Sequence, residues 1–312
     1  MVYNIRHKIR QLLNVPTQLR DIDNELASSK MLIGKLHAER VKNIKEFYPI
    51  HAAEFKVFSQ FGDDGIIQHL LTRLQIERER QVFVEFGVED YSEANTRFLL
   101  ENNNWRGLVM DGSRDNVKKI RRADYYWRHD LTAKAVFITR ENINDVIEQA
   151  GFSGELGILH IDIDGNDYWV WQALEVVNPI IVIVEYNSVF GDRAAVTVPY
   201  DQKFERTKKH YSNLYWGASL KALWVLGQKK GYELVGSNSA GNNAYFVRRD
   251  KLGDFRPLKA EEAYVESRFR ESRDADGRLT FFTGHERLKA IENLPVYDVE
   301  AGKKILLKGV TQ

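Results

Sequence analysis

Short runs of β-branched and other apolar residues, separated by stretches with helical spacing, recur along the chain from about residue 57 onward. A helix is expected over 66–74, before the first of these runs. The runs predicted as strands are 81–85, 107–111, 135–138, 156–162 and 180–186. Near-continuous apolar runs are typical of strands buried on both faces, and helices between them are typical of βαβ crossovers. The chain is therefore expected to form an α/β fold around a mainly parallel sheet.

Two further runs, 232–236 and 244–248, lie close together and are joined by the turn-rich segment 237–243. This spacing predicts an antiparallel hairpin. Five parallel strands followed by a hairpin is the order typical of class I methyltransferases, whereas a dinucleotide-dependent dehydrogenase usually continues with another βαβ unit. We therefore predict a Rossmann-like, mostly parallel seven-stranded sheet that ends in an antiparallel hairpin.

The residues on either side of this region differ in character. Residues 1–56 are predicted to form an N-terminal helical arm, because apolar residues recur there at helical spacing among charged ones. Its apolar positions are Leu19, Ile22, Leu26, Ile33 and Leu36. Ser29 and Arg40 interrupt the heptad pattern, so two interpretations stay open, namely packing on the chain's own core and formation of a homo-oligomer. Residues 57–250 form the predicted sheet domain, and the charged residues 251–312 are expected to be a helical or looped C-terminal extension.

The charge balance of the chain limits its partners. Its 45 Lys and Arg residues stand against 44 Asp and Glu residues, so no overall field attracts nucleic acid or an anionic membrane. The sequence has no cysteine, which excludes disulfides and thiolate metal sites. The most apolar stretch, 179–184, is far shorter than the ~20 residues of a membrane-spanning helix. We expect a cytoplasmic protein without a transmembrane segment and without a nucleic-acid partner.

The end of the first predicted strand has the residues of a ligand-binding turn. Gly87 permits a sharp turn and the close approach of a ligand to the backbone, and the carboxylate of Glu85 can accept from a ligand hydroxyl or ammonium. Glu89 and Asp90 would repel a pyrophosphate, which argues against a dinucleotide site. An ordinary strand-to-helix turn is the alternative interpretation.

The ends of the second and third strands extend this pattern. Asp111 closes the second strand, where a carboxylate can accept from both ribose hydroxyls of an adenosine-containing ligand. Glu141 and Asn142 follow the third predicted strand, at the place where such folds hold adenine. Thr139 beside them is equally explained as a helix N-cap.

Polar residues also gather after the fourth and fifth predicted strands. They are His160, Asp162, Asp164, Asp167, Glu185, Tyr186 and Asn187. The carboxyl ends of adjacent parallel strands converge on the ligand crevice, so we expect these side chains to share a small volume. Either Mg²⁺ neutralises the carboxylates, or one of them has a raised pKa and acts as a general base. The structural alternative is a capped turn over 164–167, with Glu185 paired to an arginine.

Five segments together resemble FkbM-like methyltransferases. They are SQFGDDG at 59–65, VEFGV at 84–88, NT at 95–96, LHIDIDG at 159–165 and VEYN at 184–187. The resemblance spans roughly residues 57 to 250. It implies that S-adenosylmethionine is the cofactor, that Glu85, Gly87 and Asp111 line its pocket, and that Asp162 and Asp164 face the acceptor. The sequence departs from the usual glycine-rich first motif at 89–91.

Relatives of this group often methylate hydroxyl oxygens in polysaccharide or glycolipid pathways, and certain sugar O-methyltransferases bind a metal after strands four and five. The resemblance thus makes Asp162, Asp164 and Glu185 candidate Mg²⁺ ligands. The implied partner is a small-molecule or glycan acceptor, and the candidate acceptor contacts are Asp167, Tyr186 and Asn187.

The leading hypothesis is an S-adenosylmethionine-dependent O-methyltransferase that acts on a sugar hydroxyl. Asp162 is the preferred group to orient or deprotonate that hydroxyl, and His160 is a second candidate catalytic residue, although it is equally explained as a core histidine. A metal-dependent glycosyltransferase is an alternative, because Asp162 and Asp164 form a D-x-D pattern. A non-catalytic scaffold that recruits partners through the N-terminal helix is the third.

Overall fold

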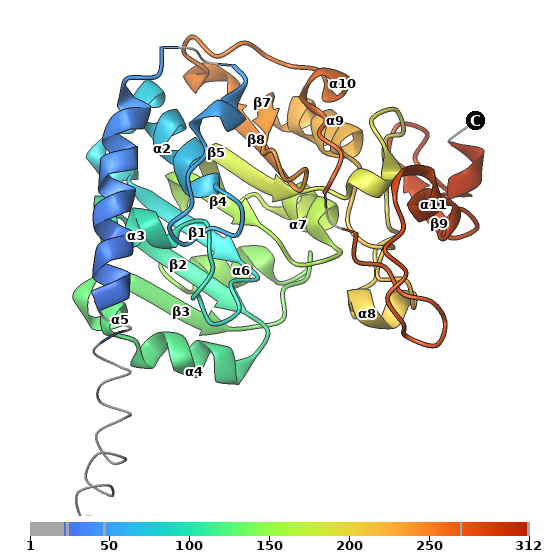
Figure 1. Ribbon diagram of the computed structural model, residues 1–312, viewed down its shortest axis with the longest axis horizontal. Helices are drawn as coiled ribbons and strands as arrows, with labels where there is room; N and C mark the ends of the chain where they lie inside the picture. Colours follow the sequence, from blue (N-terminus) through green and yellow to red (C-terminus); the bar gives the residue numbers. More distant parts are fainter. Residues whose placement is uncertain (1–21, 23–24, 46–47, 269, 311–312) are drawn as a thin grey trace, which may run out of the picture.

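A seven-stranded sheet forms the centre of the molecule (Figure 1). The computed structural model describes residues 22, 25–45, 48–268 and 270–310. The strands of the large sheet are β1 Val82–Phe86, β2 Arg106–Asp111, β3 Leu131–Ala135, β4 Gly154–Ile161, β5 Val177–Glu185, β7 Tyr232–Ser237 and β8 Asn243–Arg248. Their order across the sheet is β3-β2-β1-β4-β5-β8-β7, and β8 runs antiparallel to both of its neighbours. The predicted mostly parallel sheet with a terminal hairpin is confirmed.

The third strand was predicted at the wrong position. The structure places β3 at Leu131–Ala135, where Leu131 pairs with Gly107 and Ala135 with Asp111, and not at 135–138. β3 lies at the edge of the sheet with alternating burial, so its sequence is only weakly apolar. The more apolar residues 136–138 follow the strand and line a cavity instead.

Helices cover both faces of the sheet. They are α2 Asp63–Leu74, α3 Arg97–Asn103, α4 Arg114–Arg122, α5 Asp124–Arg128, α6 Ile143–Glu148, α7 Asp167–Ala173, α8 Arg206–Lys209, α9 Leu220–Lys230, α10 Ala260–Ala263 and α11 Gly284–Lys289. One core lies between the sheet and α6, α7 and α9, and a second lies between the sheet and α2, α3 and α4. Side chains alternate between these cores along each strand, as Phe83 and Val84 do in β1. In the described part of the chain, no helix combines the length and apolar character required to cross a bilayer.

The N-terminal arm is helical over residues 25–42 and lies along one side of the sheet domain, beside α3 (Figure 1). Gly34, Ala38 and Val41 form its inner face. A Cβ on residue 34 would come within 2.5 Å of the Val57 side chain, so the helix packs closely there. The apolar residues that predicted the helix are instead exposed, with Leu26 at 65% and Leu36 at 73%. Leu19 lies outside the described residues.

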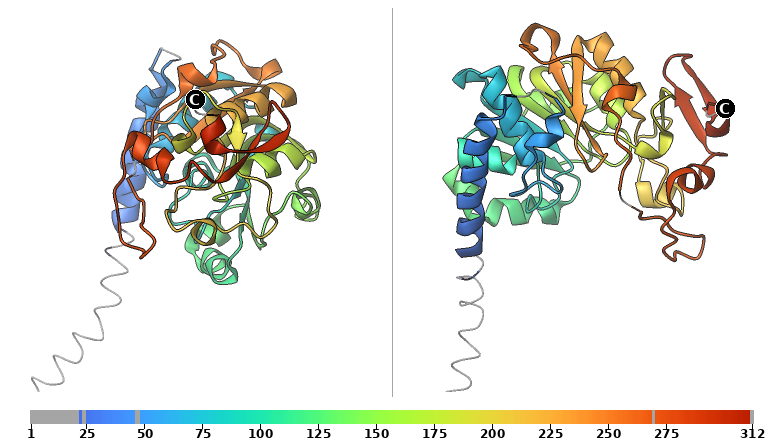
Figure 2. Two further views of the ribbon diagram at one scale, coloured as in Figure 1. Left: turned by 90° about the vertical axis from the view of Figure 1, so that its right-hand side faces the viewer. Right: turned by 45° about the horizontal axis from the view of Figure 1, so that its top comes forward.

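The C-terminal extension contains strands that the sequence analysis did not predict. β9 Pro295–Asp298 and β10 Lys303–Leu306 join β6 Val196–Thr197 in a three-stranded antiparallel sheet. Figure 2 shows that this small sheet and α11 stand beside the large sheet, next to α8. The extension therefore packs against the segment between β5 and α9, which follows the fifth parallel strand.

Candidate active site

A cavity of about 570 Å³ lies at the carboxyl ends of the parallel strands. Seven of the predicted site residues line it, and they come from the ends of β1, β2, β4 and β5. These residues are Glu85, Gly87, Asp111, His160, Asp162, Asp164 and Glu185. A volume of this size is typical of a small-molecule or cofactor site.

Gly87 allows the ends of β1 and β4 to meet. Its backbone has a positive φ of 69°, and a Cβ at this position would come within 1.7 Å of the carbonyl oxygen of Asp162. No side chain fits in that space. The sequence predicts that Gly87 lets a ligand approach the backbone. In the structure, the backbone at Asp162 makes this close approach instead, in the cavity wall between Glu85 and the acidic residues after β4.

The carboxylate of Glu85 is bound within the protein. It accepts from the backbone N–H groups of Asn95 (2.9 Å) and Thr96 (3.1 Å), from the Thr96 hydroxyl, and from Nδ1 of His160 (2.8 Å). Nε2 of His160 lies 3.1 Å from Nδ2 of Asn95. Both ring nitrogens of His160 are thus engaged inside the protein, and Glu85 fixes the turn before α3.

The pKa values of Glu85 and His160 shift in opposite directions. Burial raises the pKa of the Glu85 carboxyl, but the hydrogen bonds and the positive charge of His160 outweigh it, so the pKa is lowered. Burial lowers the pKa of the His160 ring, but the hydrogen bond and negative charge of Glu85 outweigh that effect and raise it. The pair is therefore held as an ionic or strongly polarised hydrogen bond beneath the cavity.

Asp111 presents its carboxylate to the cavity from the end of β2. Its Oδ2 accepts from the N–H of Glu89 (2.9 Å), and its Oδ1 accepts from the N–H of Ser113 (2.7 Å) and from Asn116 (3.1 Å). These three donors fix its orientation. A carboxylate has about four acceptor positions, so it can still accept a bond from a ligand.

Next to Asp111, one end of the cavity is apolar. It is lined by Met110 and by the residues that follow β3, which are Val136, Phe137 and Ile138. Their apolar character predicts a strand over 135–138, so the sequence did not identify them as site residues. This surface offers a flat ring system an apolar contact beside a hydrogen-bonding carboxylate.

Glu141 and Asn142 do not line this cavity. Glu141 accepts from the Tyr200 hydroxyl and pairs with Arg140 (2.9 Å). Asn142 accepts from the N–H of Thr139 and donates to the carbonyl of Phe137. These contacts hold the loop after β3. Glu141 and Asn142 lie farther along this loop than predicted, because β3 ends at Ala135.

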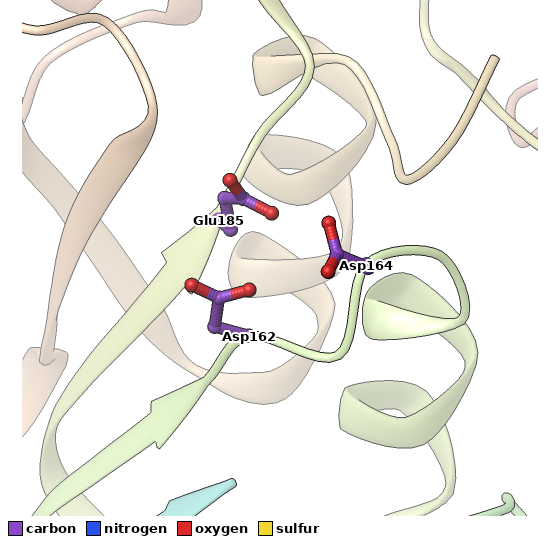
Figure 3. Close-up of side chains that lie close together, drawn as sticks. All are labelled: Asp162, Asp164 and Glu185. Carbon is purple, nitrogen blue, oxygen red and sulfur yellow. The ribbon is translucent and has the colours of Figure 1, made fainter. Parts of the chain in front are cut away.

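Three carboxylates converge at the other end of the cavity. Asp162, Asp164 and Glu185 each offer an oxygen, and the three atoms lie within 4.8 Å of one another. Figure 3 shows their side chains pointing toward one another from the ends of β4 and β5 and from the loop before α7. Oε2 of Glu185 is buried without a hydrogen-bond partner among the described residues, while Asp164 is paired with Arg206 at 2.9 Å. We refer to Asp162, Asp164 and Glu185 as the acidic trio.

Burial and mutual repulsion change the protonation of the acidic trio. Burial and the neighbouring charge of Asp164 raise the pKa of Asp162 to about 7. Burial and the charges of Asp162 and Asp164 raise the pKa of Glu185 above its usual value. The trio therefore holds a proton near neutral pH or requires a bound cation in its place.

The remaining predicted residues lie around the trio but not in the large cavity. Asp167 accepts from the N–H groups of Ile163 and Gly165 (both 2.9 Å) and so shapes the loop before α7. The Tyr186 hydroxyl donates to the carbonyl of Val265, and Asn187 donates to backbone carbonyls of 214 and 216. Tyr186 and Asn187 line a smaller cavity that adjoins the first.

The large cavity is strongly acidic. Seven of the described residues that line it are acidic, namely Glu85, Glu89, Glu93, Asp111, Asp162, Asp164 and Glu185. Arg206 is the one arginine among those described lining residues, and Asp164 already pairs with it. Glu89, Glu93 and Arg206 were not predicted as site residues. Such a field attracts a cationic ligand or a metal ion and repels a free phosphate.

No family model and no curated protein matches the sequence. Solved structures with a similar course of the chain include the N-terminal domain of EvdMO1 with S-adenosylhomocysteine bound (11% identity, 67% of this chain and 93% of that chain, TM-score 0.35). They also include a putative O-methyltransferase from Klebsiella pneumoniae (11%, 73% and 96%, 0.38) and the DszA carbon methyltransferase (16%, 62% and 54%, 0.39). The strand order and the antiparallel position of β8 establish that this chain has the Rossmann-like fold of class I methyltransferases.

Proposed function

We propose that this chain is an S-adenosylmethionine-dependent O-methyltransferase that acts on a sugar hydroxyl of a polysaccharide, a glycolipid or a related metabolite. The observation that carries the proposal is the acidic cavity at the strand ends of a class I methyltransferase fold. S-adenosylmethionine has a sulfonium and an ammonium group, and a carboxylate-lined cavity favours both. A cofactor with a pyrophosphate would meet repulsion at the same surface.

The cofactor would lie between Asp111 and the acidic trio. Asp111 is oriented by three protein donors and has acceptor capacity for the ribose hydroxyls. The apolar residues Met110, Phe137 and Ile138 form the adjacent surface for adenine. Glu85 and Gly87 serve this arrangement indirectly, because Glu85 fixes the turn before α3 and Gly87 permits contact with β4.

Asp162 is the group that we assign to proton transfer. Bound S-adenosylmethionine supplies an activated methyl group, so the protein has to position the acceptor oxygen and remove its proton. The raised pKa of Asp162 is near neutrality, which suits a general base. Asp162 would orient the acceptor hydroxyl toward the methyl group and would take up its proton when that group is transferred. His160 has both nitrogens engaged, so its role is to position Glu85 and Asn95.

As the alternative to a proton on Asp162, the acidic trio fits a hard divalent cation such as Mg²⁺. Oxygen ligands within 4.8 Å of one another suit such an ion, and the unpartnered Oε2 of Glu185 provides a free ligand atom. Asp162, Asp164 and Glu185 would hold the ion, which would supply positive charge next to the acceptor oxygen. Arg206 partly neutralises Asp164 when no cation is bound.

The glycosyltransferase alternative shares this D-x-D pair but needs the cavity to accept a nucleotide diphosphate. Glu89, Glu93 and Asp111 line the rest of the same cavity, where they would repel it. The departure from the glycine-rich motif at 89–91 is the sequence feature that favours the scaffold alternative. In the structure, Tyr91 in that motif is buried and its hydroxyl lies 2.8 Å from Thr96 Oγ1, so the loop is well packed without further glycines.

Calorimetric titration with S-adenosylhomocysteine tests the proposal. We expect binding by the wild type and about 10- to 100-fold weaker binding by Asp111→Asn, because a charged acceptor for the ribose is lost. Asp115→Asn, on an exposed side chain of α4, is the matched control and should bind like the wild type. A folded wild-type protein that shows no binding would contradict the proposal. Thermal stabilisation by a nucleotide-sugar with Mn²⁺, but not by S-adenosylhomocysteine, would favour the glycosyltransferase.

A further inference from the structure

A second cavity, of about 170 Å³, adjoins the large one. The two cavities share Gln60, Glu185, Arg206 and Asn242 as lining residues. A molecule that places one of its groups at the acidic trio can therefore extend another group into the second cavity. The far wall of this cavity comes from the C-terminal extension, which contributes Arg287 on α11.

Arg287 is a buried cation with an unused donor. Its exposed fraction is 7%, and its Nε has no hydrogen-bond partner among the described residues. One Nη donates to the carbonyl of Ser267 at 3.3 Å, and no described carboxylate lies within ion-pair distance of the guanidinium. Burial lowers the pKa of Arg287, but a guanidinium stays charged in proteins. The negative charge of Glu266 partly offsets this effect, but Glu266 forms no ion pair with Arg287. A buried charge that is only partly compensated destabilises the fold, so this arrangement requires an explanation.

Two other charged groups of the second cavity, Arg206 and Glu271, are already paired, whereas Glu185 belongs to the acidic trio. Arg206 contacts Asp164 at 2.9 Å, and its guanidinium lies over the Trp216 ring at 4.6 Å. Glu271 pairs with Arg273 at 3.3 Å. Arg287 is thus the cation of this cavity that forms no ion pair within the described part of the chain.

We propose that the methyl acceptor carries an anionic group, a carboxylate or a phosphate ester, and that Arg287 binds this group in the second cavity while the reacting hydroxyl lies at the acidic trio. This inference rests on the proposed function, because it takes the acidic trio as the place of methyl transfer. A guanidinium with a free Nε–H beside its Nη groups can donate two parallel bonds to a carboxylate or phosphate. Arg287 would then select an acidic sugar and fix which of its hydroxyls is methylated.

Binding of charged and neutral sugars tests the proposal. The probes are D-glucuronate, α-D-glucose 1-phosphate and D-glucose, titrated by NMR in the presence of S-adenosylhomocysteine and Mg²⁺. We expect the wild type to bind at least one anionic probe about tenfold more tightly than glucose, because glucose has no anionic group to accept a charge-assisted hydrogen bond from Arg287. Comparison of glucuronate with glucose 1-phosphate distinguishes a carboxylate site from a phosphate site. Equal affinities of the wild type for all three probes would overturn the proposal.

Variants of Arg287 test whether this residue causes the preference for the anionic probe. Arg287→Gln should remove the preference for the anionic probe, Arg287→Lys should keep part of it, and glucose affinity should not change. Arg278→Gln, an exposed arginine of the same extension, is the matched control. Full retention of the anion preference in a folded Arg287→Gln protein would contradict the assignment of this residue.

Stability separates a ligand-binding arginine from a structural one. If the role of Arg287 is to bind a ligand, Arg287→Met should leave the Tm of the ligand-free protein unchanged or raise it, because the substitution removes a buried charge that has no ion-pair partner. A structural arginine would instead lower the Tm when replaced. The anionic probe should raise the Tm of the wild type and not that of Arg287→Met.

The titration with S-adenosylhomocysteine alone keeps the two proposals apart. Cofactor binding without an anion preference would refute the role of Arg287 and leave the methyltransferase proposal standing. An anion preference that depends on Arg287 in a protein that binds no S-adenosylhomocysteine would refute the methyltransferase instead.

Discussion

Gly87 and Asp162 are in direct backbone contact, so close that a Cβ on residue 87 would lie 1.7 Å from the Asp162 carbonyl oxygen. This contact joins the end of β1 to the end of β4. The contact places the turn after β1 next to the acidic trio. Residues from two separate sequence motifs therefore line one continuous cavity. The glycine of the first motif is therefore required by the packing of the site itself.

Gly87→Ala should destabilise the fold and abolish cofactor binding. Gly154→Ala is a matched control, because Gly154 has nearly the same φ (71°, against 69°) but nothing within 4 Å of its Cβ position. We expect Gly154→Ala to cost about 1 kcal/mol of unfolding free energy from backbone strain alone. Gly87→Ala should cost about 2 kcal/mol more, because the backbone of 162 must move. Equal losses for the two variants in urea denaturation would refute the packing role.

Glu85→Gln should lower the pKa of His160. The negative charge and hydrogen bond of Glu85 raise that pKa, and an amide removes the charge. Because the folded-state pKa of His160 lies above the ordinary histidine value of about 6.5, protonation of the ring stabilises the fold at pH values below about 6.5. This stabilisation is lost as the pH rises through the folded-state pKa. NMR titration of the His160 ring measures the shift. Glu93→Gln, an acidic lining residue without a contact to His160, should leave the titration unchanged.

The stability of the metal-free protein should decrease as the pH rises from about 4 to about 7. In the folded state the pKa of Asp162 is raised to about 7, whereas an unfolded aspartate titrates near 4. The folded state therefore binds more protons in this range, and the unfolding free energy falls with increasing pH. Glu185→Gln should make this decrease shallower, and the exposed control Glu148→Gln should not. Thermal unfolding at several pH values is the measurement.

Cation binding should depend on pH in the opposite sense. Mg²⁺ or Mn²⁺ must displace the protons that the acidic trio holds, so affinity should increase between pH 6 and pH 8. The Tm increase caused by Mn²⁺ should accordingly be larger at pH 8, and Asp164→Asn should reduce it. A Mn²⁺ effect of equal size at both pH values would show that the ion binds elsewhere.

The outer face of the N-terminal helix predicts self-association. Leu26 and Leu36 lie on this face with Ile22 and Ile33, all more than half exposed, while the inner face packs on the sheet domain. A second copy of the helix would cover these side chains at heptad spacing. Leu26→Glu combined with Leu36→Glu should convert a dimer into a monomer in light scattering. Trp127→Glu, at an equally exposed apolar residue on α5, is the control. A monomeric wild type would contradict the prediction.

The sequence was sufficient to predict the elements that are buried on both faces. β4 and β5 are buried over most of their length, so their residues form mainly apolar runs, and the polar residues at their carboxyl ends mark the site. β3 could not be located in this way, because an edge strand such as Leu131–Ala135 needs few apolar residues. The apolar residues 136–138 resembled a strand, although they line the cavity and Phe137 is 51% exposed. An apolar run alone does not show what its side chains contact.

The parts of the site that the sequence did not reveal come from distant segments. Arg206 and Arg287 reach the acidic trio region from the long connection after β5 and from α11, and neither belongs to a predicted motif. No local pattern distinguishes them from the other arginines of the chain. Likewise, the exposure of Leu36 depends on the docking of Gly34 and Ala38, which a helical repeat alone does not specify.

A crystal structure of the protein with S-adenosylhomocysteine tests most directly whether the carboxylates at the ends of β1, β2, β4 and β5 surround one cofactor site. We predict that the ribose hydroxyls lie within hydrogen-bond distance of Asp111 and that the sulfur faces Asp162. A ligand bound outside this cavity, or one that leaves both carboxylates without contact, would contradict the account.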